Sequence, residues 1–364
     1  MKSRFINFVI SFLSLLVGIY IIELSLYFSI EKKNSVSIHD KVMELDRKQQ
    51  KPVTIIYPNQ NLKLISEDSF SLAGISNKIT VLCSEEKRWS VYKSDRFGFR
   101  NYDEIWDKQN IDYLFIGDSF TQGACVEDRN TTSENLMRKY EGKINIINLG
   151  YGGTGPLYQY AILKEYYPEK EINKVLWFFF EGNDLYDLKI ELKSEKLNKY
   201  LNEDNFQQNL KLKQAEIDKI LQKNFKSNIK PKLKKNLLIQ TIKITQLRYH
   251  FKNLIKLKKD ISFDYKEYKE ILIKAKNFVK NKNSELILVY IPIYTRYYGD
   301  DHNLNLIYEK IKKISRELDI NLIDIVKEFD QLDSQDIYYA EKSNKHFNIN
   351  GYKFLSKILY EELN

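Results

Sequence analysis

The sequence predicts an α/β protein with a mainly parallel β-sheet, a helical insertion in the sheet domain and a transmembrane helix at the amino terminus. Three observations indicate this arrangement. An apolar stretch of spanning length opens the chain, short apolar runs alternate with longer helical stretches, and a lysine-rich segment interrupts that alternation. With 364 residues, 43% hydrophobic and 29% charged, the composition excludes a disordered or collagen-like protein. A chain of this length buries a core without staples.

The amino-terminal stretch predicts the compartment. Lys2 and Arg4 precede a run over 5–30 whose only charged residue is Glu23. About 20 apolar residues span a bilayer, whereas a cleaved signal has a shorter apolar stretch and a small-residue cleavage site, which does not stand out here. We therefore expect residues 1–33 to be an uncleaved anchor in the inner (cytoplasmic) membrane, with the rest of the chain on the periplasmic, extracytoplasmic side. Glu23 then either snorkels to the outer interface or contacts a helix partner.

Residues 34–110 are expected to form a linker and an upstream extension. The polar start of this region is followed by β-type runs at Val53–Tyr57 and Ile79–Cys83. The stretch 95–101, Asp-Arg-Phe-Gly-Phe-Arg-Asn, is interpreted as an ordered turn whose arginines pair with acids. Contact of those arginines with an anionic or sugar substrate is the alternative.

The domain over 111–364 carries apolar runs of strand length, each followed by a helical stretch. Such runs are typical of strands that are covered on both faces, and their alternation with helices implies βαβ units. In a parallel sheet of this kind the functional site lies at the carboxyl ends of the strands. The runs are Tyr113–Ile116, Ile144–Leu149, Val175–Phe180, Leu286–Ile291 and Asn321–Ile325.

The segment over about 189–260 is expected to be a basic helical insertion that caps the sheet domain. It holds 19 lysines and arginines against seven acids, in a chain whose net charge is +9. A solvated basic face is the simplest interpretation, and contact with anionic lipid or polysaccharide is the alternative. Because the basicity is confined to this segment, no nucleic-acid partner is expected.

Four segments carry residues suited to nucleophilic catalysis. Ser119 stands between a strand and a helix start, where backbone N–H groups can stabilise an oxyanion, although Asp-Ser is also a capping pair. The glycine-rich stretch 150–155 brings backbone N–H groups close to a ligand or makes a tight turn. Asn183 follows a strand and can aim its amide at the same oxyanion. His346 precedes the last helix and can act as general base.

Serine, glycine, asparagine and histidine in this order resemble the SGNH hydrolase family, also called GDSL-like lipases and esterases. The resemblance covers about 110–190 and 284–364, and the stretch 95–101 resembles one in membrane-anchored bacterial members. It implies a flavodoxin-like three-layer α/β/α sandwich with a parallel sheet. It also implies hydrolysis or transfer of acyl groups with no metal and no cofactor.

The resemblance also implies roles for individual residues. Ser119 corresponds to the nucleophile and His346 to the base. The backbone N–H groups of Ser119 and Gly153, with the side chain of Asn183, correspond to the oxyanion hole, and Gly150 is the second alignment for the glycine.

One departure from the family concerns the residue that orients the histidine. The family usually has an aspartate two or three residues before it, and here those positions are Asn344 and Ser343. Asn344 could orient His346 through its side-chain oxygen, or a backbone carbonyl could leave a Ser–His dyad. A carboxylate from elsewhere is the third option. The candidates are Asp324, Asp336 and Glu341.

The two cysteines, Cys83 and Cys125, are too few for a disulfide scaffold and are not spaced as a zinc site. In an oxidising compartment a lone pair within reach is oxidised. We expect a disulfide that ties the upstream extension to the sheet domain, and two free buried thiols are the alternative.

The expected function is an exported, membrane-anchored serine esterase or O-acyltransferase that acts on acyl esters, above all acetyl esters of cell-surface polysaccharide. A catalytically degenerate relative that binds carbohydrate or serves assembly is the competing hypothesis, because the aspartate is missing. A lipid-surface or nucleic-acid binder that works through the basic insertion is the third. Five tyrosines could stack on sugars or simply pack in the core: Tyr151, Tyr158, Tyr294, Tyr297 and Tyr298.

Overall fold

The computed structural model describes most of the chain and divides it into two compact units. One unit consists of residues 1–43 with the described part of 229–262, and the other of residues 44–228 and 263–364. The described residues are 2–33, 38–58, 70–86, 88–228, 241–248, 251, 263, 265–299, 303–343 and 345–364.

A five-stranded parallel sheet forms the centre of the second unit. Its spatial order is β5-β4-β6-β7-β8, and every neighbouring pair runs parallel. Renumbered within this sheet the order is 2-1-3-4-5, which is that of flavodoxin-like folds. The strands overlap all five predicted runs, and the predicted fold class is confirmed. They are β4 (Ile111–Ile116), β5 (Ile146–Asn148), β6 (Ile172–Phe180), β7 (Glu285–Ile291) and β8 (Asn321–Asp324).

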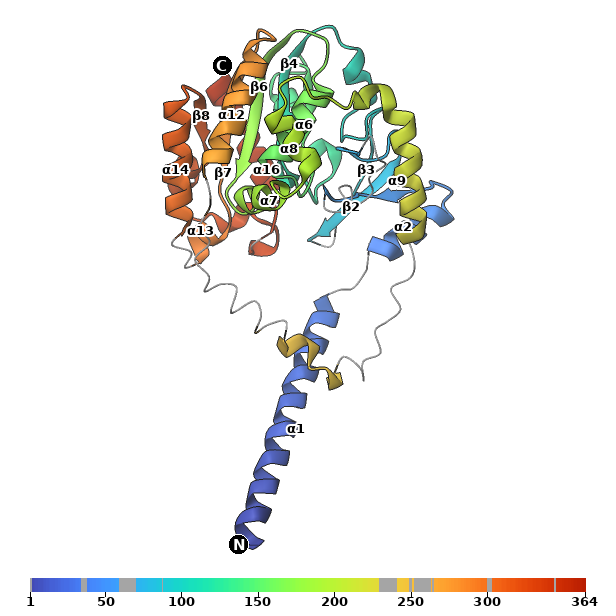
Figure 1. Ribbon diagram of the computed structural model, residues 1–364, viewed down its shortest axis with the longest axis vertical. Helices are drawn as coiled ribbons and strands as arrows, with labels where there is room; N and C mark the ends of the chain where they lie inside the picture. The colour runs from blue at the N-terminus through green and yellow to red at the C-terminus, as the bar shows by residue number, and fades with distance from the viewer. Residues whose placement is uncertain are drawn as a thin grey trace. The chain divides into compact units, whose positions relative to one another are not determined.

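Helices cover both faces of this sheet and complete a three-layer sandwich (Figure 1). The connection from β4 to β5 runs in one direction along the sheet and the later connections run in the other. Right-handed crossovers therefore place their helices on opposite faces. One face carries α6 (Pro156–Tyr166), α12 (Tyr265–Lys280) and α14 (Asn303–Glu317), and the other carries α5 (Thr132–Lys139), α15 (Ile325–Asp330) and α16 (Ile349–Leu363).

The strands are continuously apolar because both of their faces are buried. In β6, Val175 and Trp177 join the core beneath α6 and α12, whereas Leu176 and Phe178 join the core beneath α16. Successive side chains of a strand point to opposite faces, so a sheet with two covered faces has no position for polar side chains.

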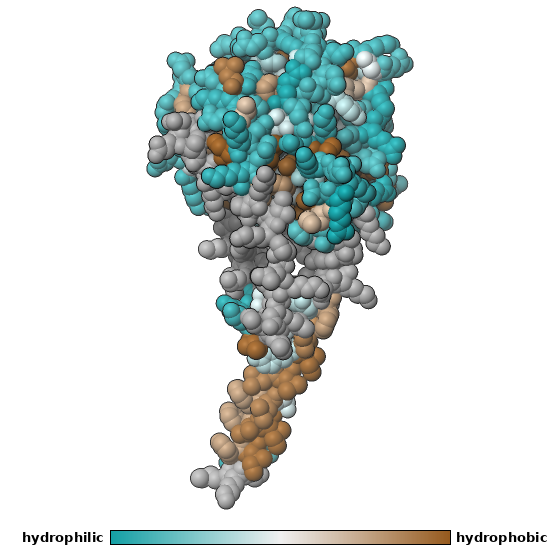
Figure 2. Space-filling model, turned by 90° about the vertical axis from the view of Figure 1, so that its right-hand side faces the viewer, coloured by the Kyte–Doolittle hydropathy of each residue, from teal (hydrophilic) through white to brown (hydrophobic). Residues whose placement is uncertain are grey.

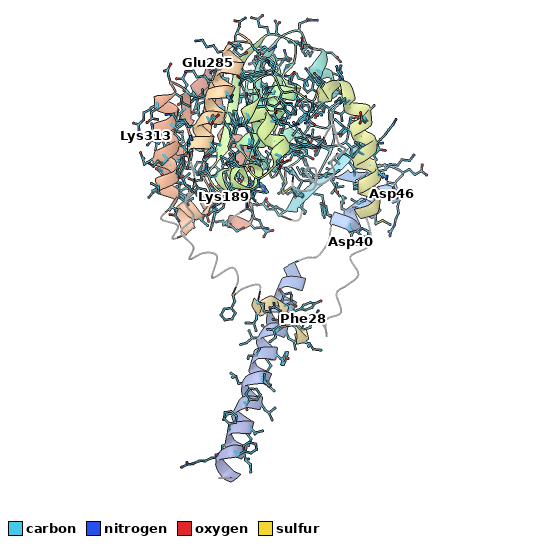
Figure 3. All side chains as sticks on the ribbon, in the orientation of Figure 1. Phe28, Asp40, Asp46, Lys189, Glu285 and Lys313 are labelled. Atoms are coloured by element: carbon cyan, nitrogen blue, oxygen red, sulfur yellow. A yellow bond between two sulfur atoms is a disulfide. The ribbon has the colours of Figure 1, made fainter. Side chains whose placement is uncertain are left out.

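The carboxyl end of the sheet is where the candidate residues are expected. Figure 3 labels a residue near each end: Glu285 begins β7, and Lys189 lies on α7 (Asp184–Glu191), which follows the carboxyl end of β6. Connections leave β4 and β6 in opposite directions along the sheet, and doubly wound proteins bind ligands at that switch point. Short helices surround it: α4 (Ser119–Gln122), α13 (Thr295–Tyr298), η2 (Asp128–Asn130), η4 (Asp336–Tyr338) and η5 (Ala340–Lys342).

The upstream extension forms a second sheet within the same unit. Its order is β1-β2-β3, with β1 parallel to β2 and β2 antiparallel to β3. Leu82 and Tyr92 of this sheet join the same apolar core as α6, so the predicted boundary at residue 110 does not separate two units. The elements of the extension are α2 (Ile38–Arg47), β1 (Val53–Thr54), β2 (Ile79–Glu85), β3 (Arg88–Lys93) and η1 (Asp103–Asp107).

The stretch 95–101 is an ordered turn. The buried carboxylate of Asp95 accepts hydrogen bonds from the Trp106 indole and from two backbone N–H groups, and burial raises its pKa to about 6. Arg96 pairs with Asp103, and the buried Arg100 donates to two backbone carbonyls in the loop after α4. Both arginines therefore have the structural role that was the first interpretation of this stretch.

The basic segment over about 189–260 divides between the two units, so it is not a single cap. Its first half packs on the sheet unit, where Leu197 and Leu221 are buried in the main core. Its second half belongs with the amino-terminal helix. The elements of the first half after α7 are α8 (Glu195–Asn202), η3 (Leu210–Lys213) and α9 (Gln214–Asn228).

The amino-terminal helix, α1 (Lys2–Lys33), is the one helix in the described ranges that is long and apolar enough to cross a membrane. Its apolar part, Arg4–Phe28, contains an 18-residue stretch with a mean hydropathy of 2.4 and forms an apolar column in Figure 2. The buried carboxylate of Glu23 accepts the backbone N–H groups of Gln246 and Leu247 at 2.7 and 2.8 Å. Of the two alternatives for Glu23, the structure therefore shows a helix partner, and that partner lies within this chain.

Candidate active site

The loop after β4 presents Ser119 at the carboxyl end of the sheet. Strand β4 ends at Ile116 and α4 begins at Ser119. Asp118 caps this helix, since its carboxylate accepts the Phe120 N–H at 2.9 Å. Burial raises the pKa of Asp118 to about 6, while the Phe120 N–H and the nearby His346 act to lower it.

His346 reaches Ser119 across 227 positions of sequence, with its Nε2 at 2.9 Å from the serine Oγ. The histidine lies three residues before α16, in a segment fixed by a bridge between Tyr339 and Phe347 and by a hydrogen bond from the Ala340 N–H to the His346 carbonyl. Ring contacts of Phe120 with His346 and Phe347 pack the imidazole against the serine helix. Ser119 and His346 therefore have the geometry of a nucleophile and its base.

The carboxylate at the other imidazole nitrogen belongs to Glu85, a residue that sequence reasoning did not select. Glu85 Oε1 lies 3.0 Å from His346 Nδ1, and the Glu85 side chain is 12% exposed. Glu85 is the last residue of β2 in the upstream extension, far outside the region in which the family resemblance applies. A signal for it existed in the predicted Cys83–Cys125 disulfide, because residues two apart on a strand share a face.

The acids proposed as substitutes for the missing aspartate have other partners. Asp324 caps α15 and accepts the Tyr308 hydroxyl, Asp336 pairs with Lys342, and Glu341 pairs with Lys345. None of these three acids contacts His346 Nδ1, because Glu85 lies there. Asn344 itself lies outside the described residues.

The glycine-rich loop packs directly against Ser119. At Gly150 a Cβ would lie 2.5 Å from the Gln122 backbone nitrogen, so only glycine permits this close approach to α4. The N–H groups of Gly150 and Gly152 are already donated to the side chains of Asn148 and Gln122. Gly153 has a φ of 76°, and its N–H donates none of the hydrogen bonds found among the described residues. Of the two alignments, Gly153 is thus the glycine with an available donor.

Asn183 lies at the start of α7 without capping it. Its side chain makes no capping hydrogen bond, and its buried Oδ1 has no partner in the part of the chain that the structure describes. Two residues earlier, the buried Glu181 pairs with Arg296, which joins the loop after β6 to the loop after β7. The amide of Asn183 is therefore uncommitted, on a loop that is held at both strands.

Helix α7 places further carboxyl groups behind the glycine loop. The Glu191 carboxylate accepts the N–H groups of Gly155, Leu157 and Tyr158 and so fixes the start of α6. Burial raises the pKa of Glu191 to about 8 and that of Asp187 to about 7.

A disulfide joins Cys83 of β2 to Cys125, which follows α4 by three residues. Glu85, Cys125 and His346 offer ligand atoms within 4.8 Å of one another, an arrangement that could hold a metal ion. Cysteine binds a metal as its thiolate, however, and the Cys125 sulfur is bonded to Cys83 and is not available as a ligand. Of the other two candidate ligands, Glu85 contacts His346 Nδ1, and His346 Nε2 contacts Ser119.

For two of the five tyrosines, the structure shows core packing, which was the alternative to sugar contact. Tyr151 and Tyr158 are fully buried, and their hydroxyls donate to backbone carbonyls of the upstream extension. Tyr294 and Tyr298, after the carboxyl end of β7, are stacked with ring centroids 4.8 Å apart, and Tyr298 is exposed. Tyr297 stacks on Phe329.

No protein-family model and no curated protein matches this sequence. Solved structures similar to it include a lipase/acylhydrolase from Enterococcus faecalis (13% identity, 70% of this chain and 95% of that one, TM-score 0.41). Others are a lipolytic G-D-S-L family member from Veillonella parvula (15%, 69% and 97%, 0.37) and an acetyl xylan esterase (13%, 70% and 100%, 0.40). The fold class of this chain rests on its own sheet order and layers.

Proposed function

We propose that this chain is a membrane-anchored serine esterase or O-acyltransferase of the SGNH type, with its catalytic unit on the extracytoplasmic side. The observation that carries the proposal is the 2.9 Å contact between Ser119 Oγ and His346 Nε2 at the carboxyl end of the sheet. A serine hydroxyl is a weak nucleophile until a base removes its proton, and this contact supplies the base.

The reaction follows from the order of these groups. The Ser119 proton passes to His346 Nε2 as the oxygen attacks the acyl carbonyl carbon, and the carbonyl oxygen becomes an oxyanion. The N–H groups of Ser119 and Gly153 and the Asn183 amide are the donors for that charge. His346 then returns the proton to the leaving alkoxide, which leaves an acyl group on Ser119. Water completes hydrolysis by the reverse sequence, and a sugar hydroxyl in its place completes transfer.

The proposed substrate is an acetyl ester of a cell-surface polysaccharide. An anchor in the inner membrane puts the site next to polymers outside the cytoplasm, and α1 has the length and hydropathy that an anchor requires. The stacked, partly exposed rings of Tyr294 and Tyr298 lie beyond the same strand ends as the site. Aromatic rings of this kind are suited to sugar faces.

The catalytically degenerate alternative depended on the missing aspartate. A buried carboxylate does contact His346 Nδ1, so the absence of an aspartate two or three residues before the histidine is not an argument against catalysis. The site supports the enzyme hypothesis over a carbohydrate-binding protein.

The test uses the purified full chain in detergent with 4-nitrophenyl acetate and a fluorophosphonate probe. We expect ester hydrolysis and a single adduct on Ser119, both lost in Ser119→Ala and His346→Ala. Ser133→Ala, at a buried serine of α5, is the matched control. Absence of both hydrolysis and labelling in the folded wild-type chain would refute the proposal. Addition of a deacetylated polysaccharide separates transfer, in which acetyl appears on the polymer, from hydrolysis.

A further inference from the structure

The carboxyl end of β2 in the upstream extension lies at the imidazole of His346. Glu85 Oε1 is 3.0 Å from Nδ1, and the second carboxylate oxygen, Oε2, is buried without a partner among the described residues. Glu85 ends β2 opposite Arg88 of β3, so it stands at the tip of a hairpin. Among the described residues, the Glu85 carboxylate pairs with His346, and no ion pair joins it to Arg88 on the opposite strand.

We propose that Glu85 is the positioning residue of the Ser119–His346 pair, and that the Cys83–Cys125 disulfide holds it there, so that catalysis depends on the oxidised state. The proposal rests on the esterase or acyltransferase function above. It makes the upstream extension part of the active site.

The chemistry requires a carboxylate at this nitrogen. With Glu85 at Nδ1, the imidazole keeps its Nδ1–H directed at the carboxylate, and Nε2 is the atom left to accept the Ser119 proton. When that proton arrives, the imidazolium is stabilised by the adjacent carboxylate. Asp118 is the other charged group facing the imidazole, but its carboxylate caps α4 on the serine side.

The disulfide is placed to fix this contact. Cys83 precedes Glu85 by two residues on β2, and both lie beyond the register shift of that strand, so their side chains share a face. Its partner Cys125 lies with Sγ 3.8 Å from His346 Nδ1. The loop that carries Cys125 is itself held by the buried Arg100, which donates hydrogen bonds to the carbonyls of Gly123 and Val126. The disulfide thus links β2, which carries Glu85, to the loop that follows the Ser119 helix, and it does so beside the imidazole of His346.

The first experiment compares Glu85→Gln and Glu85→Asp with the wild-type chain in the ester assay. We expect Glu85→Gln to lower kcat by about 10²–10⁴-fold with little change in KM, as loss of the orienting carboxylate does in serine hydrolases. Its acidic limb in kcat/KM should move to lower pH, and fluorophosphonate labelling of Ser119 should slow by a similar factor. Glu85→Asp should recover part of the loss. Glu86→Gln, one residue further on, removes the same charge and is the matched control.

The second experiment concerns the disulfide. Reduction with a phosphine, or the double change Cys83→Ser and Cys125→Ser, should lower kcat toward the Glu85→Gln value. In the Glu85→Gln variant, reduction should cause no further loss of kcat, because the contact between the Glu85 carboxylate and His346 is already absent. Circular dichroism of each sample checks that the fold persists.

The outcomes separate this proposal from the proposed function. An active wild-type enzyme whose kcat is unchanged in Glu85→Gln overturns the positioning role alone. A wild-type chain that neither hydrolyses esters nor labels at Ser119 overturns the function itself. Equal loss on reduction in the wild type and in Glu85→Gln overturns the link between the disulfide and Glu85. If reduction unfolds the chain, the comparison of Glu85→Gln with Glu85→Asp in the oxidised protein decides the matter.

Discussion

At the scale of single residues, the Ser119 hydroxyl contacts His346 Nε2 at 2.9 Å and the Asp118 carboxylate at 3.4 Å, while most other polar groups around it are paired elsewhere. The N–H groups of Gly150 and Gly152 are donated to the side chains of Asn148 and Gln122, the Asp118 carboxylate caps α4, and the acids near the histidine in sequence pair with other groups. What remains uncommitted is the N–H of Gly153 and the amide of Asn183, with His346 between Ser119 and Glu85. Such an inventory of satisfied groups identifies donors that the sequence alone left as alternatives.

Asn344→Asp tests whether the orienting position near the histidine is vacant. Because Glu85 already contacts Nδ1, we expect the new aspartate to change kcat by less than about threefold, in contrast to the about 10⁴-fold that an orienting carboxylate contributes where it is needed. Initial rates with 4-nitrophenyl acetate measure this. A gain of tenfold or more would mean that Glu85 does not orient the imidazole.

Asn183→Ala tests the oxyanion donor on α7. Loss of one preorganised donor lowers kcat by about 10²–10³-fold, and KM should stay nearly constant because the charge forms only in the transition state. Asn202→Ala, at the exposed end of α8, is the control. Equal kcat in Asn183→Ala and the wild type would exclude Asn183 from the oxyanion hole.

At the scale of elements, α7 carries several carboxyl groups and holds the start of α6. Asn183 directly precedes it, the buried Asp184 and the half-buried Asp187 lie on it, and it ends at Glu191, which binds three N–H groups at the start of α6. Burial raises the pKa of Asp184 well above its ordinary value, and the charge of Asp118 acts in the same direction. A row of carboxyl groups that prefer to hold their protons thus supports the oxyanion side of the site.

Asp187→Asn tests the pH dependence that follows. Its folded-state pKa of about 7 lies above the unfolded value near 4, so its contribution to stability is complete below about pH 4 and is lost as the pH rises through about 7. We expect Asp187→Asn to exceed the wild type in free energy of unfolding by about 1–3 kcal/mol more at pH 8.5 than at pH 4.5. Urea unfolding at the two pH values measures the difference, and exposed Glu203→Gln is the control. A pH-independent difference would contradict the burial of this charge.

At the scale of the whole molecule, the chain consists of two compact units, one with the apolar helix α1 and one with the parallel sheet. The unit with α1 also contains residues 241–248, whose backbone N–H groups bind the Glu23 carboxylate. A buried carboxylate on an otherwise apolar helix is costly unless it has such partners. The described residues 241–248 of the basic segment are thereby attached to the apolar helix, whereas the first half of the segment completes the core of the sheet unit.

The proposed role of α1 as an uncleaved anchor predicts the form and the location of the protein in the cell. We expect the mature protein to keep its amino-terminal residues, to remain in the membrane after alkaline carbonate extraction, and to give active alkaline phosphatase when that enzyme is fused after residue 364. A fusion at the amino terminus, on the cytoplasmic side, should be inactive. A mature protein that begins after about residue 30 would show that α1 is a cleaved signal.

Much of this architecture was readable from the sequence because its signals are local. Continuous apolar runs predicted the five strands, since a strand covered on both faces needs no polar position, and the ends of two of them indicated where Ser119 and Asn183 lie. The 26-residue run over 5–30 gave α1 by length alone. The sequence left the role of tyrosines such as the buried Tyr151 open, because an aromatic ring with a hydroxyl is equally suited to a core and to a sugar surface.

By itself, then, the sequence determined the parallel sheet, the apolar helix and which side chains stand at the strand ends, because each depends on neighbours within one element. Only the tertiary structure decided that Glu85 contacts His346, that the upstream extension shares the core of the sheet unit, and that the basic segment divides. Those facts depend on segments up to 261 positions apart, and residue patterns within one segment carry no information about the distance between two.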